Sequence, residues 1–82
     1  MRVRLLFFAA LRDVVGAAEQ ELVLPDDVNN VARLLECLPS EIPTLRARLA
    51  SVRVAINETF VDGDASLQEG DTVALLPPVT GG

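Results

Sequence analysis

The sequence of 82 residues contains no histidine, tyrosine, tryptophan or lysine, and it contains one cysteine, Cys37. Without an imidazole, the chain cannot build a serine–histidine triad or a histidine-based metal site. With a single thiol it cannot form an internal disulfide framework. We therefore expect no metal ion, no cofactor bound by this chain alone, and few of the parts that an independent enzyme needs.

Phosphate-binding loops, basic surfaces and long apolar runs are also missing. The glycines fit neither the G-x-x-x-x-G-K-[ST] nor the G-x-G-x-x-G spacing. The formal net charge of −5 argues against nucleic acids and anionic membranes as partners, and it is compatible with a basic protein partner. No stretch is apolar for long enough to span a bilayer, and no signal-peptide layout is present. We expect a cytoplasmic protein.

Half of the residues are hydrophobic, which is enough for one small domain with its own core. We expect this domain over residues 1–76. The spacing of the apolar residues predicts its helices and strands. The expected strands cover residues 2–8, 20–24, 52–57, 59–61 and 72–76, and the expected helices are a short one over 9–15 and a long one over 27–37.

The long helix has the clearest pattern. Asp26 and Asp27 are suited to cap its N-terminus, and Pro39 is expected to end it. Further helical turns are expected over residues 44–50. No basic residue adjoins Cys37 in the sequence to lower its pKa, so we interpret this thiol as a packing residue. The apolar stripe of the helix consists of Val28, Val31, Leu34, Leu35 and Leu38.

Two strands before the main helix and further strands after it are typical of an α+β fold of the β-grasp, ubiquitin-like kind. In that fold a mixed sheet packs one face on a single main helix. The first and last strands lie side by side in the middle of the sheet, so the residues after Leu76 leave from its centre. Alternation places Phe7 and Leu75 on the core face, and Phe8 and Leu76 on the opposite face.

The last six residues form an unusual segment: Pro77, Pro78, Val79, Thr80, Gly81 and Gly82. The prolines and the β-branched residues favour extended backbone, and the glycines carry no Cβ. Fully extended, the segment reaches about 20 Å. We expect Gly82 to be the natural terminus, so that a stiff stem holds a bare carboxyl group away from the domain. Such a group is suited to activation as an acyl-adenylate and transfer to a nucleophile such as sulfur.

Three segments carry a resemblance to a known family. Residues 5–16, LLFFAALRDVVG, are similar to an F-A-x-x-R-(E/D)-x-x-G opening, and residues 54–60, VAINETF, are similar to a V-A-V-N-x-T segment. Residues 69–82, EGDTVALLPPVTGG, closely match the same family's ending. The chain thus resembles the small subunits of molybdopterin synthase, which are ubiquitin-like sulfur carriers.

The resemblance implies a mechanism. An adenylating enzyme related to ubiquitin-activating proteins would consume ATP and convert the Gly82 carboxylate to an acyl-adenylate. A sulfur donor would then replace AMP, so that sulfur is carried covalently as a Gly82 thiocarboxylate. The tail, residues 77–82, would insert into the large catalytic subunit and donate sulfur to cyclic pyranopterin monophosphate, forming the molybdopterin dithiolene. The implied assembly is a heterotetramer, in which this chain is the non-catalytic, sulfur-donating subunit of a sulfurtransferase.

Partner-facing residues follow from the alternation without reference to the family. Phe8 and Leu76 point away from the core face, and Phe60 lies just past a turn. On neighbouring strands these side chains would form an exposed apolar patch beside the tail, and such patches usually mark an interface. The alternative is that the chain's own loops cover Phe8 and Phe60.

Rival functions remain open at this point. One is a ubiquitin-like sulfur carrier for another pathway, namely thiazole synthesis, tRNA thiolation or cysteine synthesis. Another is a ubiquitin-like modifier that is attached to lysines of target proteins. A third is an interaction module whose tail has no chemistry.

Overall fold

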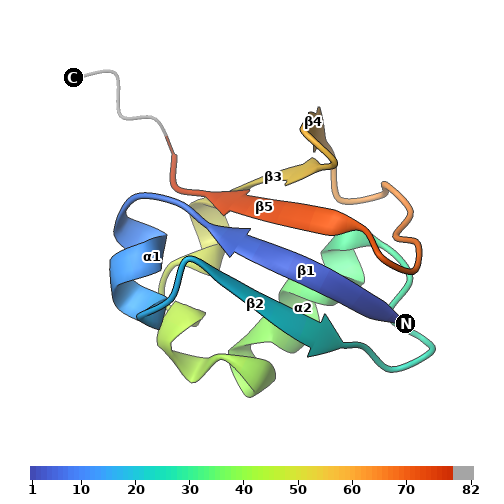
Figure 1. Ribbon diagram of the computed structural model, residues 1–82, viewed down its shortest axis with the longest axis horizontal. Helices are drawn as coiled ribbons and strands as arrows, with labels where there is room; N and C mark the ends of the chain where they lie inside the picture. Colours follow the sequence, from blue (N-terminus) through green and yellow to red (C-terminus); the bar gives the residue numbers. More distant parts are fainter. Residues whose placement is uncertain (79–82) are drawn as a thin grey trace.

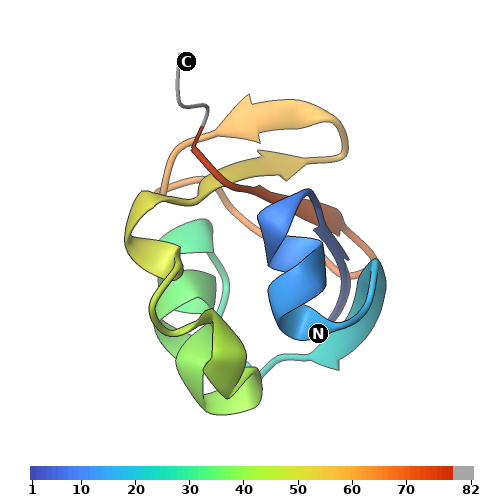
Figure 2. The same cartoon turned by 90° about the vertical axis from the view of Figure 1, so that its left-hand side faces the viewer.

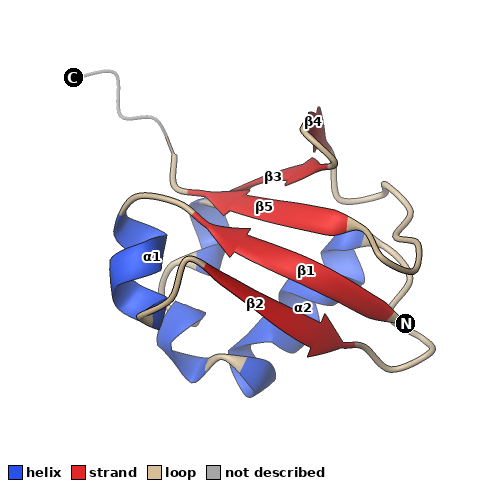
Figure 3. Ribbon diagram, in the orientation of Figure 1, coloured by secondary structure: helices blue, strands red, loops and turns tan. Residues whose placement is uncertain are grey.

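The computed structural model describes residues 1–78, which form one five-stranded sheet with helices against it (Figure 1). Figure 3 shows how the helical and strand segments are distributed. The strands are β1 (Arg2–Phe7), β2 (Glu19–Val23), β3 (Arg53–Ile56), β4 (Thr59–Val61) and β5 (Thr72–Leu76). The helices are α1 (Ala10–Val15), α2 (Val31–Glu41) and the two short 3-10 helices η1 (Pro43–Leu45) and η2 (Leu49–Ser51).

The strand order is β2-β1-β5-β3-β4. β1 and β5 are parallel neighbours, with Leu5 opposite Val73 and Phe7 opposite Leu75, whereas the other pairs are antiparallel. The first and last strands therefore lie at the centre of the sheet, as Figure 1 shows. The expected mixed sheet, with its last strand in the middle, is confirmed.

One face of the sheet is buried against the helices. In β1 the alternate residues Val3, Leu5 and Phe7 are at most 1% exposed, which is the period of two expected for a strand with one face in the core. Leu34 and Leu38 of α2 are fully buried opposite that face. Figure 2 shows α1 and α2 on the same side of the sheet, so its other face carries no helix from residues 1–78.

The N-terminus of α2 differs from the expectation. Its N-cap is Asn30, whose Oδ1 accepts a hydrogen bond from the Arg33 amide at 2.8 Å. Asp26 and Asp27 lie before the helix and do not cap it. The helix begins at Val31 because a distant loop supplies acceptors: the amides of Val31 and Ala32 donate to carbonyl oxygens of residues 65 and 63. These long-range bonds outweigh the local capping preference of the aspartates.

The C-terminus of α2 also differs, because Pro39 lies inside the helix. Proline removes one backbone donor and normally disfavours a helix interior. Here the Ile42 amide still donates to the Leu38 carbonyl oxygen at 2.7 Å, and both side chains are buried. Burial of these two residues therefore carries the helix past the proline. The turns expected over residues 44–50 are found as η1 and η2, and Leu45 of η1 is fully buried.

The short helix expected over residues 9–15 is found as α1. α1 ends at Gly16, which has a left-handed φ of 84°. Within α1, Leu11 is buried and Ala10 is exposed. Leu67 anchors the loop before β5, since its side chain is only 4% exposed. None of the helices within residues 1–78 combines the length and the apolar character needed to cross a membrane.

Candidate functional site

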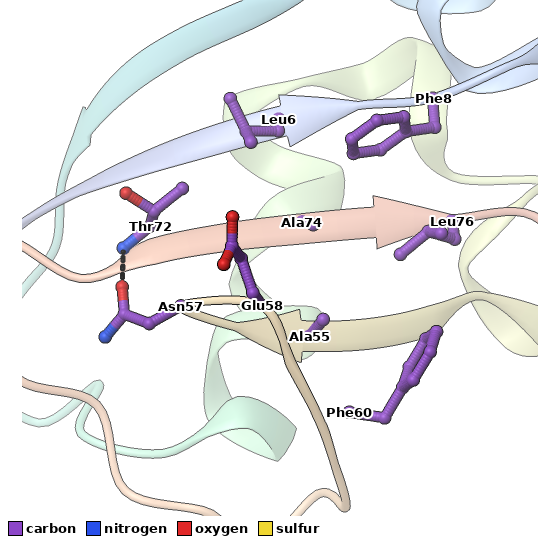
Figure 4. Close-up of a pocket in the computed structure, with 9 residues that line it drawn as sticks. All are labelled: Leu6, Phe8, Ala55, Asn57, Glu58, Phe60, Thr72, Ala74 and Leu76. Carbon is purple, nitrogen blue, oxygen red and sulfur yellow. Dashed lines mark hydrogen bonds between the residues drawn. The ribbon is translucent and has the colours of Figure 1, made fainter.

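The face of the sheet that carries no helix has an open hollow of about 510 Å³ (Figure 4). Side chains from β1, β3, β4 and β5 surround it, together with the turn between β3 and β4 and the residue after β1. It is lined by Leu6, Phe8, Ala55, Asn57, Glu58, Phe60, Thr72, Ala74 and Leu76.

The floor of the hollow is a single row across the sheet. The register pairs Leu6 with Ala74, Ala74 with Ala55, and Ala55 with Phe60. Two small side chains thus occupy the two inner strands of the row, and larger apolar ones stand at its ends. Because directly opposite residues in a sheet have Cβ atoms about 5 Å apart, the alanines leave space that longer side chains would fill. The small residues of the row are therefore what makes this face concave.

The margin of the hollow contains the aromatic residues that the sequence singled out. Phe8 is 38% exposed, Phe60 is 56% exposed, and Leu76 is half-buried. Figure 4 shows their side chains around the same space, with Phe8 just after β1 and Leu76 at the end of β5. The structure thus brings together Phe8, Phe60 and Leu76, and no loop within residues 1–78 covers the two phenylalanines.

The Phe60 ring has a charged neighbour that the sequence did not predict. The guanidinium carbon of Arg53 lies 4.6 Å from the ring centroid, which is a cation–π distance. Arg53 is also the cross-strand partner of Leu76. A cation therefore lies beside the end of β5, next to the apolar margin. No local sequence signal indicates this pair, because it depends on the register of three strands.

The opposite end of the hollow is polar, and its side chains are held by hydrogen bonds. The Asn57 side chain accepts a hydrogen bond from the Thr72 amide at 3.0 Å and donates one to Asp71 Oδ1 at 3.1 Å. The Asn57 amide donates to the Thr72 carbonyl oxygen at 2.8 Å. Asn57 and Glu58 have positive φ values of 48° and 74°, and they form the two-residue loop between β3 and β4. Asn57 therefore ties this turn to the start of β5.

A backbone hydrogen bond holds the end of β5, just before the tail begins. The Phe8 amide donates to the Leu75 carbonyl oxygen at 3.3 Å, which continues the parallel pairing past β1. Pro77 is half-buried and Pro78 is exposed. The remaining predicted tail residues, Val79, Thr80, Gly81 and Gly82, lie outside the described residues.

The other candidate groups give no second site. Cys37 is half-buried and packs against the core. Burial raises the pKa of its thiol, and the nearby carboxylates Glu41 and Asp27 raise it further. The packing interpretation of Cys37 thus agrees with its surroundings. Within residues 1–78, no group of three or more histidine, cysteine, aspartate or glutamate side chains is arranged to hold a metal ion.

Comparison with known proteins gives consistent relatives. A model of the ThiS family matches residues 5–82. The molybdopterin synthase sulfur carrier subunit of Escherichia coli strain K12 is 34% identical over 80 residues, which cover 98% of this chain and 99% of that protein.

Solved structures with the same fold agree with this result. SAMP1 from Haloferax volcanii superposes with a TM-score of 0.84 at 26% identity, and the match covers 100% of both chains. A chain from the complex of subunits 1 and 2 of the molybdopterin-converting factor of Helicobacter pylori has a TM-score of 0.71 at 26% identity, again covering 100% of both chains. The β-grasp fold expected from the sequence is confirmed by these neighbours.

Proposed function

The chain belongs to the ThiS family, and from that membership we propose that it is the sulfur carrier subunit of a molybdopterin synthase. The geometric observation that carries the proposal is the position of β5. This strand lies at the centre of the sheet, runs parallel to β1 and ends beside the hollow. The chain therefore presents a docking surface and the start of its tail at the same edge.

We propose that Gly82 is the working residue. An adenylating enzyme, related to ubiquitin-activating proteins, transfers AMP from ATP to the Gly82 carboxylate and releases pyrophosphate. A persulfide sulfur attacks the carbonyl carbon and AMP leaves, which gives an acyl disulfide. A thiol then reduces the S–S bond, so that the carboxyl group is left as a thiocarboxylate. The sulfur is then donated to cyclic pyranopterin monophosphate in the active site of the large subunit. The chain carries sulfur in this scheme, and catalysis belongs to its partners.

The sheet face supplies the recognition. Phe8, Phe60 and Leu76 dock on the large subunit, and the alanines between them admit a side chain of that partner. Docking at this edge starts the stem at Pro77 and Pro78, and six residues would span about 20 Å if they were fully extended. Desolvation of large exposed aromatic groups is the usual source of binding energy at such surfaces. The proposed assembly is a heterotetramer with the large subunit.

Reconstitution tests the proposal. The purified chain is incubated with ATP, a candidate adenylating enzyme and a persulfide source, and its intact mass is measured. We expect one oxygen atom to be replaced by sulfur, with a strict need for ATP. The product is then mixed with a large subunit and cyclic pyranopterin monophosphate, and dithiolene formation is followed. Sulfur transfer to a thiazole, tRNA or cysteine pathway instead would assign the chain to a different carrier branch.

A matched control has a single alanine added after Gly82. The extra residue moves the reactive carbonyl by about 3.5 Å, and acyl chemistry loses rate when reacting atoms are displaced by about 1 Å. It also adds a Cβ where glycine has none. We expect no thiocarboxylate and no product, with binding to the large subunit unchanged. Normal product from an untrimmed extended chain would show that the carboxyl group of Gly82 is not the working group.

A further inference from the structure

The chain is poor in groups that an activated carboxyl group could acylate. Its 82 residues include no lysine, no histidine and no tyrosine. Serine and threonine hydroxyls need an adjacent general base to act as nucleophiles, and the imidazole that most often serves as that base is absent. Arginine stays protonated and does not attack acyl groups. The nucleophiles that remain are the α-amine of Met1 and the thiol of Cys37.

The α-amine of Met1 is held in the fold. Its nitrogen donates a hydrogen bond to the Leu24 carbonyl oxygen at 3.1 Å, and the Leu24 amide donates to the Met1 carbonyl oxygen at 2.7 Å. These reciprocal bonds continue the β1–β2 ladder one step beyond the pair of Arg2 with Val23. The Met1 side chain also packs against the core. Moving the nitrogen away from β2 would break this ladder and the packing of the Met1 side chain, so the fold restricts the directions from which an acyl group can approach the amine.

The Cys37 thiol is restrained by its surroundings. It lies on α2, half-buried against the core, and two carboxylates are near enough to disfavour its thiolate. Since the thiolate is the reactive form, little of it is present near neutral pH. The fold therefore lowers the reactivity of both groups, by hydrogen bonding and packing for the amine and by burial beside carboxylates for the thiol.

We infer that the chain is protected against acylation by a second, activated copy of itself, because the β1–β2 ladder holds its one amine and its sequence provides no lysine. This inference rests on the proposed function, in which Gly82 becomes an acyl-adenylate. In the side reaction, an acceptor nitrogen would attack the carbonyl carbon and form a carbon–nitrogen bond. The carbon–oxygen bond to AMP would break, AMP would leave with the electron pair, and the nitrogen would lose a proton to water.

The consequence is selectivity for a foreign nucleophile. Among carriers alone, the acyl-adenylate is then lost only to hydrolysis by water, and a partner's sulfur nucleophile does not have to compete with carrier acylation. Carriers also do not join to one another through amide bonds. The property needs no enzyme and no active site, because it follows from which nucleophiles the chain contains and from how the remaining ones are bonded.

The first test uses no activation chemistry. The 82-residue chain is treated with the N-hydroxysuccinimide ester of acetic acid at about pH 8, where an exposed α-amine is largely reactive, and acetylation is followed by intact mass. The comparison variant carries Gly-Ser-Gly before Met1, which moves the amine beyond the Leu24 bond. We expect acetylation of the 82-residue chain to be about tenfold slower, equivalent to about 1.4 kcal/mol. Equal rates in two folded chains, checked by circular dichroism, would overturn the inference.

The second test uses the activated carrier. The chain is incubated at about pH 9 with ATP and the adenylating enzyme but no sulfur donor, and covalent dimers are counted by intact mass. Arg46 is exposed and lies away from the hollow, so Arg46→Lys adds an amine and keeps the charge. We expect at least tenfold more dimer from Arg46→Lys, and from the variant with Gly-Ser-Gly before Met1, than from the unaltered chain. Equal dimer yields would overturn the inference. Absence of pyrophosphate release would refute the proposed function, and the acetylation rates would still decide the inference.

Discussion

The two faces of β1 and β5 are built from alternate residues of the same segments, yet they differ in packing. On the inner face, Leu5 and Leu75 are fully buried against the helices. On the outer face, Leu6 and Leu76 are only half-buried and Phe8 is 38% exposed. Residues that are adjacent in sequence therefore have different surroundings. In particular, Leu75 lies in the core and Leu76 lies at the margin of the hollow.

Under the proposed function, the inner face of the sheet provides stability and the outer face provides docking. The inner face is filled by large side chains that share one buried core with Leu34 and Leu38 of α2, and such packing is sensitive to the loss of single methylene groups. The outer face has alanines in the middle of its row and larger residues around them, so it leaves space where the inner face has none. We therefore expect substitutions on the inner face to change folding, and substitutions on the outer face to change binding.

The largest effect is expected for Leu75→Ala. Truncation of a fully buried leucine typically lowers the free energy of unfolding by about 2–5 kcal/mol, because apolar contacts are lost and a cavity remains. The matched control is Leu76→Ala, one residue further along the same strand. We expect that control to lose less than about half as much, since its side chain keeps partial contact with solvent. Urea denaturation of both variants gives the comparison, and equal losses would mean that the two faces do not differ.

Phe8→Asp should weaken binding to the large subunit and leave the fold intact. The new carboxylate stays hydrated in the free chain, where Phe8 is already 38% exposed, but it becomes buried and unpaired in the complex. Loss of such an anchor commonly costs about 2 kcal/mol or more, which is about 30-fold in affinity. Titration calorimetry measures the affinity, and circular dichroism checks the fold.

The control for Phe8→Asp is Val23→Asp. Val23 is 66% exposed and pairs with Arg2 across β1 and β2, so it lies on the same face but away from the hollow. We expect this variant to bind the large subunit normally. Equal weakening by both variants would point to general charge repulsion. Unfolding of Phe8→Asp would place Phe8 in the core and contradict the assignment of the two faces.

The sequence predicted the fold through local periodicity. The alternation in residues 2–8 and 72–76 identified the inner and outer residues of β1 and β5 correctly, because one face of each strand is buried. The bounds of α2 were wrong at both ends. Its start depends on carbonyl oxygens supplied by a loop more than 30 residues later, and its end depends on the burial of Leu38 and Ile42 beyond a proline. Asn30 is as good a local N-cap as the aspartates, so local signals do not choose between these residues, and they do not show the burial beyond the proline.

The site was predictable only in part. Alternation and a turn indicated Phe8, Phe60 and Leu76, and the structure places them around one hollow. The alanines of its floor, Ala55 and Ala74, carry no chemistry that would draw attention in a sequence. Their importance comes from the register that aligns them across three strands, and the register is a property of the folded sheet.

Asn57 tests the difference between the two faces, because it lines the hollow on the outer face but its side chain forms hydrogen bonds that stabilise the fold. Asn57→Ala removes bonds to Thr72 and Asp71 and places alanine at a φ of 48°. We expect the free energy of unfolding to fall by about 1–2 kcal/mol. Asn57→Gly loses the same bonds, but glycine adopts the positive φ without strain. Its free energy of unfolding should therefore fall less than that of Asn57→Ala. Thermal unfolding measures both, and an unchanged Asn57→Ala would show that the hollow's polar end does not stabilise the turn.

The smallest effect is expected for Glu58→Gly, with the opposite sign. Glu58 has a φ of 74° as the second residue of a two-residue hairpin loop, where glycine is strongly preferred because L-residues are strained in this region. Relief of about 1–2 kcal/mol of strain is partly offset by the greater freedom of glycine in the unfolded chain, about 0.4–1 kcal/mol. We therefore expect the free energy of unfolding, measured by thermal unfolding, to rise by about 0.5–1 kcal/mol. Glu58→Ala removes the same carboxylate and keeps the strain, so it should give no gain. Binding of the large subunit separates stability from docking. If both variants bind more weakly while only the glycine variant is more stable, then the Glu58 carboxylate contacts the partner. The strained turn would then serve to present that carboxylate at the hollow.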